Sequence, residues 1–199
     1  MTLPNKLTLG RILVVPVMIV IACIPYLNGH TIFLGVTYAN FINFILFVLA
    51  SITDFLDGYI ARKYNLVTTF GKFADPLADK MLVLTSLMIL MVQFRTASFG
   101  DFGLEIVPLW AVAIILIREL MVSGIRLVAA QKGEVIAAGM AGKVKTFVTM
   151  IAIGIAFLAG LDNVVAIISL VMIYVSVILT VYSGIVYFIN AKEILLESV

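Results

Sequence analysis

The amino-acid sequence predicts an all-α polytopic membrane protein with six transmembrane helices. Of the 199 residues, 63% are hydrophobic and only 12% are charged, whereas about a quarter of the residues in an average soluble domain are charged. The mean hydropathy is +1.21. These values exclude a disordered chain and an ordinary soluble domain. A membrane helix needs about 20 mostly apolar residues, so we expect residues 1–199 to form a single transmembrane domain.

The first two helices come from one long stretch without charged residues, between Arg11 and Asp54. This stretch is too long for one membrane span. The polar turn residues Asn28-Gly29-His30 interrupt it. We therefore expect one helix at about residues 9–27 and a second at about residues 41–62.

The residues ahead of the first helix are mostly polar or small. We expect residues 2–8 to form a short N-terminal interfacial segment that lies along the membrane surface. A cleaved signal peptide is the alternative interpretation of residues 1–27. It is disfavoured because the apolar run is longer than a usual signal-peptide core and no small-residue cleavage site follows it.

Four further apolar stretches predict the remaining helices. The third helix keeps its acidic residues in its first turns, and the last stretch is long enough for a tilted helix. Turn-forming residues lie before the fourth helix, at 100–103, and before the sixth, at 160–163. The expected ranges are about 73–94, 106–128, 145–160 and 163–191.

The distribution of Lys and Arg predicts the orientation. With six spans, both termini lie on the same side of the membrane. Every Lys and Arg except Arg95 falls on that side or within the fourth span. The positive-inside rule therefore predicts a multi-pass cell-membrane protein with both termini in the cytoplasm. Tyr187, near the end of the last span, is interpreted as part of an interfacial aromatic belt.

Four acidic residues gather where the second and third helices are joined. They form two pairs with helical spacing, so each pair shares one face of its helix. The connection between these helices is short, which predicts antiparallel neighbours whose carboxylates meet at the cytoplasmic boundary. The four residues are Asp54, Asp57, Asp75 and Asp79.

Four carboxylates this close repel one another unless cations neutralise them. Two divalent cations would balance the charge, with Mg²⁺ as the first choice and Mn²⁺ as the second, because hard cations take carboxylate oxygens and share their coordination with substrate phosphates. Gly58 and Ala61, on the face of the first pair, leave room for a bulky group, and Arg62 can hold a phosphate oxygen. A single Asp at a membrane boundary is often an ordinary solvated helix end, but facing pairs separated by small residues argue against that interpretation.

The spacing Asp54-x2-Asp57-Gly58-x2-Ala61-Arg62-x8-Gly71-x3-Asp75-x3-Asp79 resembles the complete signature of the CDP-alcohol phosphotransferases. The resemblance implies six transmembrane helices, a polar cavity facing the cytoplasm, two divalent metals and a homodimer. It assigns the four Asp as metal ligands and Asp79 also as the catalytic general base. The residues that it assigns to CDP-diacylglycerol are Asn5, Thr8, Gly58, Ala61, Arg62 and Thr68.

Further motifs resemble one branch of that family, the bacterial phosphatidylglycerophosphate synthases. They are Pro4-Asn5-x-Leu7-Thr8-x2-Arg11, Arg118-Glu119, Ser123-Gly124-x-Arg126 and Gly142-Lys143-x-Lys145-Thr146. This resemblance implies that the phosphatidyl group of CDP-diacylglycerol is transferred to sn-glycerol 3-phosphate. The products would be phosphatidylglycerol phosphate and CMP, in phospholipid biosynthesis.

Basic residues on the fourth and fifth helices predict the site for the acceptor phosphate. Charged residues inside a span must face protein or water, and Arg offers phosphate a bidentate fork while Lys offers a point charge. The alternative is that these residues are positive-inside or lipid-headgroup anchors. The predicted acceptor residues are Arg118, Arg126, Lys143 and Lys145.

Three other functions remain open at this point. The first is the same chemistry with another acceptor, either inositol phosphate or phosphatidylglycerol. The second is an intramembrane prenyltransferase, although the Asp motifs of that class lack the companions Gly58, Ala61 and Arg62. The third is a cation carrier, although carrier sites lie near the middle of the bilayer. No nucleic-acid partner is expected.

Overall fold

The computed structural model describes residues 3–63, 69–94, 105–131 and 139–196, with side chains described in these ranges except at 3–4, 33, 57–62, 69–70, 72 and 193–196. The described residues form seven helices and one small hairpin, so the all-α prediction is confirmed. The helices are α1 (Leu3–Cys23), α2 (Pro25–Gly29), α3 (Tyr38–Lys63), α4 (Thr69–Gln93), α5 (Leu109–Gln131), α6 (Met140–Phe157) and α7 (Asn163–Leu196).

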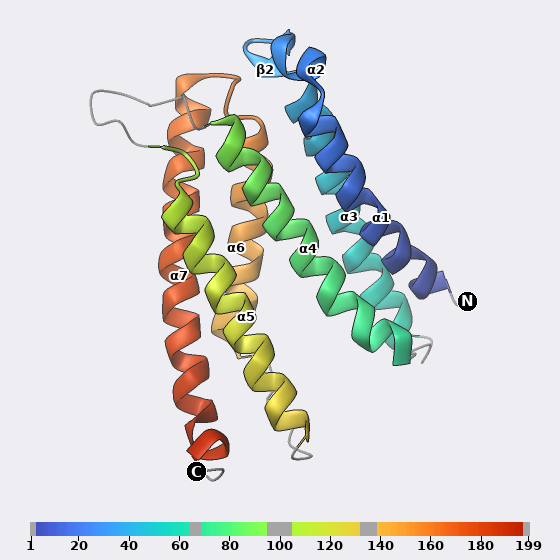
Figure 1. Ribbon diagram of the computed structural model, residues 1–199, viewed down its shortest axis with the longest axis vertical. Coiled ribbons are helices and arrows are strands. Elements are labelled where there is room, and N and C mark those ends of the chain that lie inside the picture. The colour runs from blue at the N-terminus through green and yellow to red at the C-terminus, as the bar shows by residue number, and fades with distance from the viewer. Residues whose placement is uncertain (1–2, 64–68, 95–104, 132–138, 197–199) are drawn as a thin grey trace.

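The six long helices run alternately in opposite directions along one bundle (Figure 1). We call the end where α1 begins and α7 ends the terminal end, and the opposite end the hairpin end. Helices α1, α3 and α4 pack together as one group, and α5, α6 and α7 as another. The groups meet where α3 and α4 contact α6, and where α4 contacts α5.

Four of the described helices are long and apolar enough to cross a membrane, judged by length and composition. The other two long helices, α4 and α5, carry several charged residues towards the terminal end. Each stretch of α5 that is long enough to span includes Arg118, Glu119 and Arg126. The four candidate spans are Asn5–Cys23, Tyr38–Leu56, Met140–Phe157 and Asn163–Lys192.

The N-terminal residues do not form a segment separate from the first helix, which begins at Leu3 rather than at about residue 9. Residues 3–8 are the first turns of α1 and continue into the rest of the helix without a break. The reason lies in the bundle. Asn5 and Thr8 are buried, with exposed fractions of 8% and 1%, because this end of α1 packs against α3 and α4.

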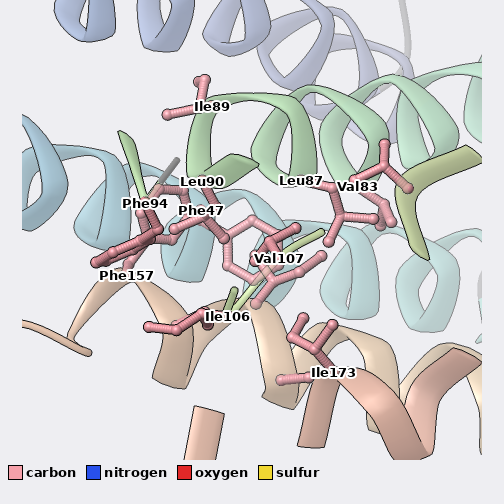
Figure 2. Close-up of a cluster of buried hydrophobic side chains, with 14 of the residues drawn as sticks. Phe47, Val83, Leu87, Ile89, Leu90, Phe94, Ile106, Val107, Phe157 and Ile173 are labelled. Atoms are coloured by element: carbon pink, nitrogen blue, oxygen red, sulfur yellow. The ribbon is translucent and has the colours of Figure 1, made fainter. Parts of the chain in front are cut away.

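A cluster of buried apolar side chains holds the bundle together towards the hairpin end (Figure 2). Phe47 of α3 and Phe157 of α6 meet with ring centroids 6.1 Å apart, while Leu87 and Leu90 of α4 pack beside them. Apolar surface gains little from leaving lipid for another helix, so close packing and polar contacts must supply much of the association. Small residues that allow close packing are buried on α4 and α6: Ala74, Ala78, Ala152 and Ala156.

The hairpin of β1 (Thr31–Phe33) and β2 (Val36–Thr37) was not expected from the sequence. Its turn contains Leu34 and Gly35, both with positive φ, at 45° and 95°. The hairpin contacts the turn between α6 and α7, where a Cβ atom added to Gly35 would lie 2.6 Å from the carbonyl oxygen of Gly160. A side chain at Gly160 would likewise lie 2.5 Å from the oxygen of Gly35. Glycine at both positions therefore lets the two helix groups meet backbone to backbone.

Candidate active site

A polar cavity of about 650 Å³ opens between the two helix groups at the terminal end. Five helices line it, each with the part that lies nearest this end. Most acidic residues of the lining come from α3 and α4, on one side, and most basic residues come from α5 and α6, on the other. The charged residues in the lining are Asp54, Asp79, Lys80, Arg118, Glu119, Arg126 and Lys143.

Helix α1 contacts two of the predicted aspartates. The Arg11 guanidinium forms an ion pair with Asp54, and the Arg11 side chain is fully buried while that of Asp54 is 35% exposed. The Thr8 hydroxyl donates a 2.6 Å hydrogen bond to Asp75 Oδ1. One face of α1, with Thr8 and Arg11 three residues apart, thus orients one carboxylate of α3 and one of α4.

Arg11 contacts a predicted site residue, although the sequence analysis did not include Arg11 among the site residues. Its position at the start of an apolar helix did indicate that Arg11 needs a partner within the protein. The sequence could not identify that partner. The assignment of Thr8 to CDP-diacylglycerol stays a prediction, and in the structure the Thr8 hydroxyl contacts Asp75.

Several predicted site residues lie outside what the structure describes. The last turns of α3 contain Asp57, Gly58, Ala61 and Arg62, whose side chains are not among those described. Thr68 lies outside the described residues altogether. Among the side chains that are described, no three His, Cys, Asp or Glu groups gather closely enough to hold a metal ion.

The described acidic side still has the donor chemistry of a hard-cation site. Asp54 and Asp79 line the same cavity from two helices, and both offer carboxylate oxygens. Asp75 lies one turn before Asp79 on α4 and is partly buried. Oxygen-only donor sets suit Mg²⁺, Mn²⁺ and Ca²⁺, so these residues fit the divalent cations that the sequence predicts.

Of the four predicted acceptor residues, three line the cavity: Arg118, Arg126 and Lys143. Lys145 does not line it. Only 3% exposed, Lys145 donates a 2.6 Å hydrogen bond from Nζ to Glu119 Oε1. The same oxygen accepts a 2.9 Å bond from Arg118 Nη1. Lys145 therefore neutralises Glu119 beneath the cavity wall.

Lys80, which the sequence analysis considered only for orientation, lies in the cavity next to Asp79. Its ammonium donates to the hydroxyl of Ser123 on α5. Ser123 in turn donates a 2.5 Å hydrogen bond to the Glu119 carbonyl oxygen. This chain of contacts ties α4 to α5 across the cavity and adds a cation beside the acidic side.

The sequence interpretation of Tyr187 was wrong. It is only 7% exposed and lines the cavity, so it does not belong to an interfacial belt. Its hydroxyl accepts a 3.3 Å hydrogen bond from Arg126 Nε. The Arg126 guanidinium carbon lies 5.5 Å from the centre of the Tyr187 ring.

The cavity therefore combines two charge types in one place. Carboxylates at one side can hold cations and accept a proton, while guanidinium and ammonium groups at the other side can hold an anion. Such a pairing suits a reaction between two phosphate-bearing substrates, since positioning and charge stabilisation supply most of the catalysis in phosphoryl transfer.

Comparison with known proteins gives a family match over most of the chain. Residues 1–182 match the family model described as CDP-alcohol phosphatidyltransferase. Three full-length relatives carry the same name, CDP-diacylglycerol–glycerol-3-phosphate 3-phosphatidyltransferase. The protein from Bacillus subtilis (strain 168) is 43% identical over 201 aligned positions, which cover 98% of each chain.

The other two relatives are more distant. The Rickettsia felis protein is 37% identical over 194 positions, covering 96% of each chain. The Wigglesworthia glossinidia brevipalpis protein is 35% identical over 190 positions, covering 94% of this chain and 93% of the relative. The similarity therefore extends over all the helices that line the cavity.

Proposed function

The chain belongs to the CDP-alcohol phosphatidyltransferase family, and from this premise we propose that it is a membrane-embedded transferase of phospholipid biosynthesis. It moves the phosphatidyl group of CDP-diacylglycerol to sn-glycerol 3-phosphate, which gives phosphatidylglycerol phosphate and CMP. The observation that carries this proposal is the single cavity with carboxylates on one side and Arg118, Arg126 and Lys143 on the other. A donor diphosphate and an acceptor phosphate need these two kinds of group.

The acidic side serves the donor in this proposal. Asp54, Asp57, Asp75 and Asp79 hold two divalent cations, Mg²⁺ or Mn²⁺. When bound, the cations neutralise the diphosphate and stabilise the leaving CMP. The residues proposed to receive CDP-diacylglycerol are Asn5, Thr8, Gly58, Ala61, Arg62 and Thr68.

Asp79 is the proposed general base. It takes the proton from an acceptor hydroxyl, whose oxygen attacks the β-phosphorus of CDP-diacylglycerol. The bond from that phosphorus to the bridging oxygen breaks, and CMP leaves with the bridging oxygen. Because a base next to cations is weak, we expect most of the rate gain to come from holding the hydroxyl in place.

The acceptor side consists of Arg118, Arg126 and Lys143, with Lys145 supporting them through Glu119. These residues keep the acceptor phosphate away from the cations, because it would otherwise compete with the diphosphate for them. One substrate is a lipid and the other is water-soluble, so we place the cavity at the cytoplasmic membrane boundary. We also propose that the enzyme works as a homodimer.

The direct test uses purified protein in detergent with CDP-diacylglycerol and one acceptor at a time: glycerol 3-phosphate, inositol phosphate, phosphatidylglycerol or none. We expect CMP release and a lipid product with the mass of phosphatidylglycerol phosphate only with glycerol 3-phosphate. CMP release with a different acceptor would leave the enzyme class intact and replace the acceptor. No CMP release with any of them would favour the prenyltransferase or carrier alternatives.

Removing one acceptor-side cation should weaken glycerol 3-phosphate binding. The loss of one charged hydrogen bond to a ligand reduces affinity roughly ten- to a hundredfold. We therefore expect Arg126→Ala and Lys143→Ala each to raise the KM for glycerol 3-phosphate by about that factor, with little change in the KM for CDP-diacylglycerol. Lys192→Ala, an exposed lysine of α7 outside the cavity lining, is the matched control. An unchanged KM for glycerol 3-phosphate in both variants would show that Arg126 and Lys143 do not bind the acceptor.

The orientation can be tested with single cysteines in a Cys23→Ser background. Because Lys and Arg are concentrated at the terminal end, Lys63→Cys and Gln131→Cys should resist a membrane-impermeant maleimide added to intact cells. His30→Cys, at the hairpin end, should react. All three positions are exposed in the structure, so burial alone does not account for protection. Labelling at 63 and 131 together with protection at 30 would reverse the orientation.

A further inference from the structure

We propose that residues 183–190 of α7 orient Arg118 and Arg126 for the acceptor phosphate. This inference rests on the proposed function and adds positioning residues to it. Ser183, Tyr187 and Asn190 all line the polar cavity. They are four and three residues apart, so they share one face of the helix.

The contact of Tyr187 with Arg126 uses a specific nitrogen. Arg126 donates from Nε to the Tyr187 hydroxyl at 3.3 Å, and its guanidinium lies over the aromatic ring, 5.5 Å from the centroid. That distance lies within the range of a cation–π contact. Within the described part of the chain, the two terminal nitrogens of Arg126 have no hydrogen bond. They are the pair that forms a bidentate fork to a phosphate.

Tyr187 is buried while Arg126 is exposed. The tyrosine is 7% exposed, and Arg126 belongs to the exposed residues of α5. An exposed arginine samples many rotamers, and it loses this freedom when it binds a ligand. The buried Tyr187 hydroxyl, by accepting from Nε, restricts the rotamers of Arg126 before the ligand binds. Less conformational entropy is then lost on binding, which favours affinity.

The same stretch of α7 also orients Arg118. The Ser183 hydroxyl donates to the Thr180 carbonyl at 3.1 Å, which leaves its oxygen to accept a 3.1 Å bond from Arg118 Nη2. The neighbouring Gly184 gives the Arg118 stem its room, because a Cβ atom at this position would lie 3.2 Å from Arg118 Cγ. Two arginines of α5 are thus positioned by one helix.

The test compares Tyr187→Phe with Tyr182→Phe. The first change removes only the hydroxyl that Arg126 contacts, and the second makes the same change at a tyrosine of α7 that is 60% exposed and outside the cavity lining. We expect Tyr187→Phe to raise the KM for glycerol 3-phosphate about five- to tenfold. The kcat and the KM for CDP-diacylglycerol should stay within about twofold, and Tyr182→Phe should match the parent.

A double variant separates positioning from general packing. If Tyr187 acts through Arg126, then Tyr187→Phe should add no further increase in KM when Arg126→Ala is already present, because the two changes remove one interaction. If the double variant instead shows the sum of the two free-energy effects on KM, the two residues act independently and the proposal is overturned. An unchanged KM in Tyr187→Phe, or a parallel change in both KM values, would overturn it as well.

A binding measurement keeps this test separate from the proposed function. Inorganic phosphate should raise the thermal stability of the parent protein in detergent, and Tyr187→Phe should need about five- to tenfold more phosphate for the same shift. This readout needs no turnover, so it holds even if glycerol 3-phosphate proves not to be the acceptor. A parent protein that phosphate does not stabilise, or variants with the same phosphate dependence, would reject the positioning role.

Discussion

The Asp75→Asn and Asp79→Asn proteins are expected to lose turnover by about a thousandfold or more while remaining folded in detergent. A general base contributes about 10²- to 10⁴-fold to the rate, and loss of a cation ligand adds to that loss. Asp79 lines the polar cavity, and Asp75 lies one turn away on α4 with its carboxylate held by Thr8. The measurement is CMP release under saturating substrates, with thermal unfolding as the check on folding.

Glu105→Gln is the matched control for these two changes. Glu105 is partly buried, precedes α5 and lies outside the cavity lining, so its neutralisation should leave turnover unchanged. A chelator should abolish the activity of the parent protein, and added Mg²⁺ should restore it. Near-normal turnover in either Asp variant would show that this carboxylate has no catalytic role. Full activity in excess chelator would show that the reaction does not need divalent cations.

The second large effect is expected on stability. Glu119→Gln should destabilise the protein by about 3–5 kcal/mol, because removing one partner of a buried ion pair leaves an uncompensated charge. Glu119 Oε1 accepts from both Arg118 and Lys145, at 2.9 and 2.6 Å. The three side chains are only 12%, 14% and 3% exposed, for Arg118, Glu119 and Lys145 respectively. For a chain of this size the melting temperature should fall by roughly 10 °C.

The compensating variant makes this prediction specific. Lys145→Met added to Glu119→Gln removes one of the two uncompensated cations and keeps a side chain of similar length. It should recover part of the lost stability, since buried ion pairs can often be replaced by apolar groups at little cost. A Glu119→Gln protein that melts at the parental temperature would mean that water or lipid headgroups already satisfy these cations.

The sequence by itself determined the helices and the composition of the acidic side. Apolar stretches separated by polar turns predict six transmembrane helices. The described residues form six long helices, of which four are long and apolar enough to cross a membrane. Their limits differ from the prediction by a few residues, since the sequence does not reveal which polar residues will find partners in the bundle. Asp75 and Asp79 share a face of α4 because helical geometry alone places residues four apart together.

Only the tertiary structure decided which faces meet. Helical spacing puts Arg118, Glu119 and Arg126 on one helix, but it does not say that Lys145 neutralises Glu119 from α6. Nor does it predict that Tyr187 of α7 holds Arg126. These contacts join residues 26 and 61 positions apart, and they depend on how α5, α6 and α7 pack.

The contacts of Arg11 and of the hairpin also depend on packing between distant parts of the chain. An arginine in an apolar helix requires a partner, but its partner, Asp54, lies on another helix more than forty residues away. Gly35 and Gly160 look like ordinary turn residues until the fold brings their backbones into contact. Local sequence determines the periodicity and the ends of each helix to within a few residues. The pairing of distant charges follows from the packing of small residues and side-chain shapes across the whole bundle, which no single stretch of the chain encodes.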